Sequence, residues 1–298
     1  MNNRIHYTKC PVCSGTSLSP VLEATDNTVS KEKFPVWQCA DCTLRFTQDV
    51  PTADTIGPYY KSEEYISHTN TSKGLINRLY HVVRGITLRN KRKLIESETP
   101  SGRGRLLDVG SGTGAFAGEM KKAGWNTTGL EPDPEARKVA LTNHGITLED
   151  MDRFHKLEPG FNAITLWHVL EHVHELHPYI ARLRELLAAD GRIFIAVPNY
   201  TSLDARKYEG AWAAYDVPRH LYHFSPASIR ALMQANGLVV KKYKPMWFDS
   251  FYISLLSSKI KSGSTSWLGA VSTGIRSNMK ALSDTQKCSS VIYIISRS

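Results

Sequence analysis

The segment 106–116, LLDVGSGTGAF, constrains the fold of this chain more than any other stretch. An apolar run ends at Asp108, and Gly110, Gly112 and Gly114 then alternate with small residues. Without a Cβ atom, glycine lets the backbone approach a ligand closely, and such a loop after a buried strand is typical of nucleotide-binding α/β sheets. The segment therefore predicts a strand, a ligand-binding turn and the start of a helix.

Strand-like and helical segments alternate after this loop. Amphipathic helices with glycine stops are expected between the strands, and the last two strands can form an antiparallel closing pair. We expect strands in residues 105–110, 126–132, 146–150, 161–167, 192–199, 238–246 and 289–298. The pattern predicts a doubly wound, Rossmann-like α/β sheet of seven strands whose last strand is antiparallel.

In such a sheet the ligand lies at the carboxyl ends of the strands. Glu131 ends the second predicted strand about 20 residues after the loop, where an acidic side chain binds ribose hydroxyls. Gly110, Gly112 and Ala115 also satisfy the dinucleotide fingerprint, so NAD is an alternative ligand. Asp108 argues against NAD, because a carboxylate before the loop suits a cationic amino-acid group better than a phosphate.

Four of the five cysteines form two C-x-x-C pairs, CPVC and CADC. Two such pairs can place four thiolates around one Zn²⁺ ion, with no open position for a substrate. Cys10, Cys13, Cys39 and Cys42 therefore predict a small N-terminal zinc ribbon with a structural metal in residues 1–50. Two reduced thiol pairs, or a redox pair, are the alternative.

The formal net charge of +9 suits an anionic partner, although a solvated basic surface is equally compatible with it. No run approaches the roughly 20 apolar residues of a membrane span. The segment MNNRIHYTKC lacks the apolar core of a signal peptide, so a cytoplasmic location is expected.

Four segments together resemble class I S-adenosylmethionine-dependent methyltransferases in order and spacing: LLDVGSGTGAF, GLEPDPEARKVA, ITLWHVLEHV and IFIAVPN. The similarity covers residues 100–298 and is greatest to the small-molecule, quinone-like branch with an H-x-L-E-H motif. The whole chain also resembles bacterial methyltransferases with an N-terminal zinc ribbon. The resemblance implies a methyltransferase domain in residues 101–298, with an insertion at 246–288, preceded by a linker and helical cap at 51–100.

The resemblance also implies which residues hold S-adenosylmethionine. Asp108 and the glycine loop would hold the methionine part, Glu131 the ribose, and Asp150 with Met151 the adenine. Trp167 would cover the cofactor beside the methyl group. The implied cofactor-binding set is Asp108, Gly110, Ser111, Gly112, Thr113, Gly114, Glu131, Pro132, Asp150, Met151 and Trp167.

The catalytic candidates follow the fourth predicted strand. His168 is predicted to be a general base or a substrate-orienting group. Relatives carry an E-x-x-E-H cluster here that binds a divalent metal, but His168 replaces its first glutamate, which puts an active-site metal in doubt. Glu171 and His172 could instead only cap the next helix. His220 is the next candidate base.

The loop WAAYDVPRHLYHFSP, residues 212–226, is expected to arch over the active-site mouth. Arg219 could hold a carboxylate or phosphate of the substrate, although an ion pair with Asp216 would occupy it instead. The predicted substrate contacts are Tyr60, Tyr65, Arg219 and His223. The tyrosines could equally be helix-packing aromatics.

Three functions are compatible with these features. We expect His-assisted methyl transfer from S-adenosylmethionine to a small molecule, such as a sugar, a lipid-like compound or a phosphorylated metabolite. The alternative is an RNA methyltransferase that uses the ribbon for recognition, but LWHVLEH replaces the Asn/Asp-Pro-Pro-aromatic motif of base-amine methyltransferases. A cofactor-binding module without catalysis is a third class. The insertion at 246–288 could form an amphipathic helix that covers the sheet or contacts a lipid-like substrate or membrane.

Overall fold

The structure is a computed structural model that describes residues 3–61 and 75–298, with side chains from residue 83 onward in the second range. Its main element is a mixed sheet with strand order β11-β12-β9-β8-β6-β7. Only β12 runs antiparallel to its neighbours. The strands are β6 (Arg105–Val109), β7 (Asn126–Leu130), β8 (Phe161–Trp167), β9 (Leu187–Pro198), β11 (Leu238–Pro245) and β12 (Ser290–Arg297). The predicted α/β fold with an antiparallel closing pair is confirmed.

The sheet has six strands in the described ranges, so the prediction of seven was wrong. The expected strand at residues 146–150 joins β7 through a single parallel bridge between Leu130 and Glu149. It stops there because Asp150 already caps the next helical turn, where its side chain accepts a hydrogen bond from the Asp152 N–H. The segment is too short to form a ladder.

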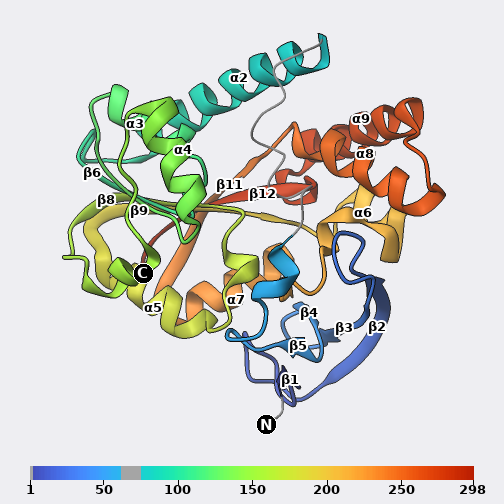
Figure 1. Cartoon of the computed structure of the whole chain (residues 1–298). Helices are drawn as coiled ribbons and strands as arrows, with labels where there is room; N and C mark the ends of the chain where they lie inside the picture. Colours follow the sequence, from blue (N-terminus) through green and yellow to red (C-terminus); the bar gives the residue numbers. More distant parts are fainter. Residues whose placement is uncertain (1–2, 62–74) are drawn as a thin grey trace.

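Helices cover both faces of the sheet (Figure 1). In the figure α2, α3 and α4 lie on one side, and α5 and α7 on the other. The helices are α2 (Leu75–Glu98), α3 (Ala115–Lys122), α4 (Pro134–His144), α5 (Leu176–Leu186), α6 (Leu203–Tyr208), α7 (Pro226–Ala235), α8 (Asp249–Ser262) and α9 (Trp267–Ser283). Short 3₁₀ turns are η1 (Gly57–Tyr60), η3 (Met151–Lys156), η4 (Leu170–His172), η5 (Glu209–Ala211), η6 (Ala213–Tyr215) and η7 (Thr285–Lys287).

Local sequence explains where these helices begin and end. Asp133 caps α4 by accepting the Glu135 N–H, and Gly145 ends it with a φ of 62°. Ser225 and Ser228 form a reciprocal capping box at the start of α7. These caps fix the positions at which the chain leaves the sheet and returns to it.

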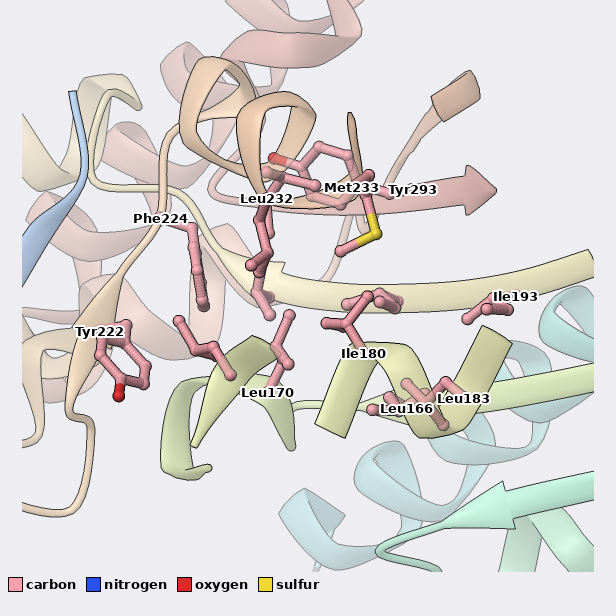
Figure 2. Packing of buried hydrophobic residues seen from close by; sticks show 14 of the residues in the cluster. Leu166, Leu170, Ile180, Leu183, Ile193, Tyr222, Phe224, Leu232, Met233 and Tyr293 are labelled. Carbon is pink, nitrogen blue, oxygen red and sulfur yellow. The ribbon is translucent and has the colours of Figure 1, made fainter. Parts of the chain in front are cut away.

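The largest core cluster lies between the sheet and the helices α5 and α7 (Figure 2). Figure 2 shows Leu232 of α7 close to Leu170 of η4, with Ile180 of α5 next to them and Ile193 of β9 farther along the same layer. Because Leu170 is fully buried in this core, it anchors the segment that carries the predicted catalytic residues.

The N-terminal region forms a second, four-stranded sheet of order β10-β4-β3-β2. Its strands are β2 (Leu18–Thr25), β3 (Lys33–Cys39), β4 (Arg45–Thr47) and β10 (Tyr222–His223), and a small separate pair is formed by β1 (Arg4–Ile5) and β5 (Val50–Pro51). Since β10 belongs to the loop at residues 212–226, the ribbon and this loop share one sheet.

The segment between β11 and β12 forms two helices, α8 and α9, where the sequence predicted one. They lie side by side at the edge of the molecule beyond α6 (Figure 1). Within residues 3–61 and 75–298, no helix combines the length and apolar character needed to cross a membrane.

Candidate active site

Three chemically distinctive segments meet at one edge of the sheet. The glycine loop follows β6, Glu131 follows β7, and His168 follows β8. These strands are parallel neighbours in the order β8-β6-β7, so their carboxyl ends lie next to one another. The predicted cofactor residues and the first catalytic candidate are therefore brought together.

The glycine loop needs its glycines for two different reasons. Gly110, Gly112 and Gly114 all have positive φ values, of 68°, 53° and 73°. A Cβ atom on Gly110 would lie 2.5 Å from Val169 Cγ2, and one on Gly114 would lie 2.6 Å from Ala140 Cβ. A Cβ atom on Gly112 would meet no atom within 4 Å. The outer glycines thus allow tight packing, while Gly112 presents backbone to open space.

Glu131 is held against this loop. Its Oε2 accepts the Gly112 N–H at 2.7 Å, and its Oε1 accepts the Asp133 N–H at 3.0 Å. Burial raises the pKa of Glu131, although both backbone hydrogen bonds oppose that change. Each carboxylate oxygen has a second lone pair, so the group could accept two further hydrogen bonds from a diol.

Asp108 lies almost fully buried at the end of β6. Thr165 Oγ1 donates a hydrogen bond to its Oδ1 at 2.6 Å. Burial raises the pKa of Asp108 to about 6, although the hydrogen bonds and the charge of Lys91 lower it. Next to it, Ser111 Oγ donates to the Asp108 carbonyl, and Thr113 Oγ1 accepts from Arg84 of α2.

The residues predicted to line the adenine lie beyond Glu131. Arg137 Nη1 donates to Asp150 Oδ2 at 2.7 Å and to the Pro132 carbonyl at 2.9 Å. A hydrogen bond from the Asp152 N–H is the main cause that lowers the pKa of Asp150. Met151 is partly buried and packs against the main core. Their adenine-binding roles remain predictions.

Trp167 contacts Lys91, a residue that the sequence did not single out. Lys91 Nζ lies 4.0 Å from the centre of the Trp167 ring, and Phe116 packs edge-on against the same ring. Burial lowers the pKa of Lys91 to about 8. Lys91 comes from α2, which has many basic residues, so nothing in the sequence distinguished it from a solvated lysine.

A cavity of about 240 Å³ lies beside Lys91. Its walls are mostly apolar, and Lys91, Lys244 and Asp249 add charge. The lining residues are Thr87, Asn90, Lys91, Leu94, Lys244, Pro245, Met246, Trp247, Phe248, Asp249 and Ile292. Four of them, residues 246–249, belong to the insertion, whose place next to the site no local pattern could indicate.

His168 sits between two carboxylates. Its Nε2 lies 3.0 Å from Asp249 Oδ2, and its Nδ1 lies 3.3 Å from Glu171 Oε1. Burial disfavours the charged imidazole, but both carboxylates stabilise it and raise the pKa of His168 to about 10. In this arrangement His168 holds a proton at neutral pH, whereas a general base must be neutral.

Glu171, His172 and His220 form a second cluster, whose ligand atoms lie within 4.8 Å of one another. His172 Nδ1 lies 3.0 Å from the Arg219 carbonyl, and His220 Nδ1 lies 2.8 Å from the Ala214 carbonyl. A carbonyl accepts only, so each Nδ1 carries a hydrogen, and Nε2 is the nitrogen that has a lone pair whenever the ring is neutral. Burial lowers the pKa of His172 to about 4, so this imidazole is neutral.

Glu171 completes this cluster. Its side chain is fully buried, and its Oε2 has no hydrogen-bond partner among the described residues. Although burial favours the neutral acid, the hydrogen bond with His168 keeps the pKa of Glu171 below its ordinary value. One carboxylate and two imidazoles could together serve as ligands of a divalent metal ion.

Tyr60 and Arg219, two of the predicted substrate contacts, have different surroundings in the structure. Tyr60 Oη lies 3.1 Å from His172 Nδ1, so Tyr60 reaches the cluster. Arg219 is buried and donates to Asp216, to Asp26 Oδ1 and to the Tyr59 carbonyl. The ion pair with Asp216, the alternative that the sequence left open, is therefore present. Its guanidinium faces protein rather than a cavity.

His223, another predicted contact, is not part of this cluster. His223 is 3% exposed, and its Nε2 lies 3.1 Å from Thr47 Oγ1 of the ribbon. Burial lowers the pKa of His223 well below its ordinary value. Tyr65 lies outside the described residues.

The four N-terminal cysteines form a compact group. Cys10 Sγ lies 3.5 Å from Cys42 Sγ, and Cys13 Sγ lies 3.6 Å from Cys39 Sγ. Zn–S bonds of about 2.3 Å in a tetrahedron place the sulfurs roughly 3.8 Å apart. The sulfur positions therefore fit a single zinc ion. Cys288 is buried away from them.

The chain is similar in sequence to known proteins. The methyltransferase-domain family matches residues 82–243. A ubiquinone biosynthesis O-methyltransferase of Xanthomonas euvesicatoria pv. vesicatoria is 27% identical over 159 residues, which cover 49% of this chain and 66% of that protein. Its counterpart in Glaesserella parasuis serovar 5 is 34% identical over 110 residues, which cover 33% of this chain and 47% of the relative.

A solved structure also shares the fold. The magnesium protoporphyrin IX methyltransferase of Synechocystis PCC 6803, solved with bound SAH, aligns with a TM-score of 0.51 and 16% identity. The alignment covers 80% of this chain and 97% of that structure. The predicted class I methyltransferase fold is confirmed by this similarity together with the family match.

Proposed function

We propose, from the premise that this chain belongs to the methyltransferase-domain family, that it transfers a methyl group from S-adenosylmethionine to a small-molecule acceptor. The observation that carries the proposal is the meeting of the glycine loop, Glu131 and His168 at the ends of three adjacent strands. The open backbone at Gly112 and the carboxylate beside it suit the amino-acid and ribose parts of that cofactor.

In the proposed reaction, the protein positions the atom that receives the methyl group and takes up the proton that this atom loses. S-adenosylmethionine supplies an activated sulfonium methyl when bound. Positioning the acceptor in line with that methyl lowers the barrier. We propose that the acceptor occupies the cavity beside Lys91, where apolar walls suit a lipid-like or aromatic body, and Lys91 with Lys244 suits an anionic group.

We assign histidine assistance to two groups with different roles. Protonated His168 would donate hydrogen bonds through both ring nitrogens and hold Asp249 and Glu171 in place. His172 or His220, with Nε2 free to accept, would take the proton of an acceptor hydroxyl. An acceptor oxygen agrees with the relatives' names as O-methyltransferases.

A second candidate for the proton-accepting centre is a divalent metal. Among the residues that the structure describes, none donates to Glu171 Oε2, and a buried carboxylate oxygen without a donor suits a cation. Glu171, His172 and His220 would hold the ion, which would lower the pKa of a bound hydroxyl.

Zinc in the N-terminal ribbon is the third part of the proposal. Cys10, Cys13, Cys39 and Cys42 would hold it as a structural ion. Four thiolates leave no position for a substrate, so its contribution is to folding. Reduced thiols agree with the expected cytoplasmic location.

The acceptor class can be tested by incubating the protein and a radiolabelled methyl donor with fractionated cell lysate. We expect label in a small-molecule or lipid fraction. Label found only in RNA would overturn the small-molecule proposal and support the RNA alternative.

The two proton-accepting centres predict opposite responses to chelation. If a metal acts, EDTA should abolish activity, and Mg²⁺ or Mn²⁺ should restore it while the zinc content stays constant. If an imidazole acts alone, EDTA should have no effect and His172→Gln or His220→Gln should lower kcat by about 10²–10⁴-fold. Full activity in both variants would rule out both centres.

A further inference from the structure

The helical hairpin of α8 and α9 is built with small residues inside and large apolar residues outside. The residues of α9 that are buried are Ala270, Thr273, Gly274, Ser277 and Ala281. Ten of the thirteen large hydrophobic residues that are exposed in the described parts of the chain lie in this region: Trp247, Phe248, Tyr252, Leu256, Trp267, Leu268, Val271, Ile275, Met279 and Leu282.

The exposed residues of α9 form one continuous stripe. Spacings of three and four residues separate Leu268, Val271, Ile275, Met279 and Leu282, so all five lie on one helix face. Leu268 is 88% exposed, Met279 63% and Leu282 74%. Such exposure is too large for residues that only cover the sheet.

The inner face of the hairpin is polar and closely packed. A Cβ atom on Gly274 would lie 2.5 Å from Phe251 Cδ1 of α8. Ser277 Oγ donates to Asp204 of α6, and Ser257 Oγ accepts from the Ala213 N–H. Helices that pack through small residues and present large apolar residues outward are typical of proteins whose outer solvent is lipid.

Apart from Asp249, the first residue of α8, which pairs with His168, the charged residues of the hairpin are all basic. Residues 250–283 include Lys259, Lys261, Arg276 and Lys280, and no aspartate or glutamate. Arg276 and Lys280 are exposed beside the apolar stripe of α9. Apolar and aromatic side chains flanked by cations suit the boundary between headgroups and acyl chains of an anionic bilayer.

We propose that the outer face of the α8–α9 hairpin docks on the surface of an anionic lipid bilayer without crossing it. A second copy of this chain suits the face less well, because a two-fold pairing through it would bring the cations of both copies together. The cavity beside Trp247 and Phe248 adjoins this face. Docking of the protein through this face would therefore hold the cavity near the membrane surface. The docking does not depend on the proposed function.

Vesicle binding tests this proposal. The full chain should co-sediment with vesicles of phosphatidylcholine and phosphatidylglycerol, and binding should fall in high salt and with pure phosphatidylcholine. The double variant Leu268→Gln/Leu282→Gln should lower the partition coefficient at least tenfold, and Arg276→Gln/Lys280→Gln should lower it for anionic vesicles only. Both variants should keep the wild-type melting temperature, because these side chains are exposed.

Leu141→Gln is the matched control, since Leu141 is 57% exposed on α4 and far from the hairpin in the sequence. Its vesicle binding should equal that of the wild type. The proposal is overturned if the folded wild type does not bind anionic vesicles, or if Leu268→Gln/Leu282→Gln and Leu141→Gln bind alike. A dimer in solution that Leu268→Gln/Leu282→Gln converts to a monomer would assign the face to a second copy instead.

Discussion

At the scale of single residues, the fold strongly changes the pKa of His168. Its φ of 58° is unusual for a residue with a side chain, and such strain is concentrated at functional sites. The backbone turn directs the imidazole between Asp249 and Glu171. The sequence predicted a general base or a substrate-orienting group here, and it could not show that the carboxylate of Asp249, 81 residues away, lies beside the imidazole.

The His168–Asp249 pair should make stability depend on alkaline pH. Since the folded pKa of His168 is about 10, above the unfolded value of about 6.5, its contribution is complete below pH 6.5 and is lost as pH rises through 10. Asp249→Asn should therefore lower the melting temperature most near pH 6.5, and the difference from wild type should shrink by pH 10.5. Thermal unfolding across this range measures it.

Asp284→Asn is the control for that experiment, because its ion pair with Lys287 is exposed at the surface. It should change the melting temperature little at any pH. A His168 imidazole that titrates near pH 6.5 in NMR spectra of the wild type would contradict the assigned charge.

At the scale of elements, the ribbon and the arching loop depend on each other. β10 of the loop pairs with β4 of the ribbon, and Arg219 of the loop binds Asp26 in the turn between β2 and β3. His172, at the candidate site, contacts the Arg219 carbonyl. A change in the ribbon therefore reaches the site through the loop.

Loss of zinc should weaken catalysis more than cofactor binding. Cys39→Ser removes one thiolate, and a ribbon of this size depends on its metal for folding. We expect zinc to be lost and kcat to fall, while S-adenosylmethionine affinity stays near the wild-type value, because the glycine loop and Glu131 directly follow β6 and β7, outside the ribbon. Elemental analysis, kinetics and calorimetry measure these effects.

Cys288→Ser is the matched control, since Cys288 is buried outside the four-cysteine group. It should keep zinc. Wild-type protein that is folded, reduced and free of zinc would contradict the zinc assignment.

Across the whole molecule, the features that could be predicted from the sequence are those determined by residues close together in the chain. The glycine loop, the alternation of strands and helices and the closing pair of β11 and β12 all carry signals within a few residues. Residues 146–150 look like a strand, but only tertiary context shows that they make a single bridge. Lys91 and Asp249 come from distant elements, so their place in the site required the fold.

Calorimetric titration can show whether the edge formed by β6, β7 and β8 binds S-adenosylmethionine. The wild type should bind S-adenosylmethionine and not NAD. Glu131→Ala should weaken binding by about 1–3 kcal/mol, because ribose hydroxyls lose their buried acceptor. Glu135→Ala, an exposed change on α4, should have no effect. Unchanged affinity in Glu131→Ala, or tighter binding of NAD by the wild type, would show that this edge is not an S-adenosylmethionine site.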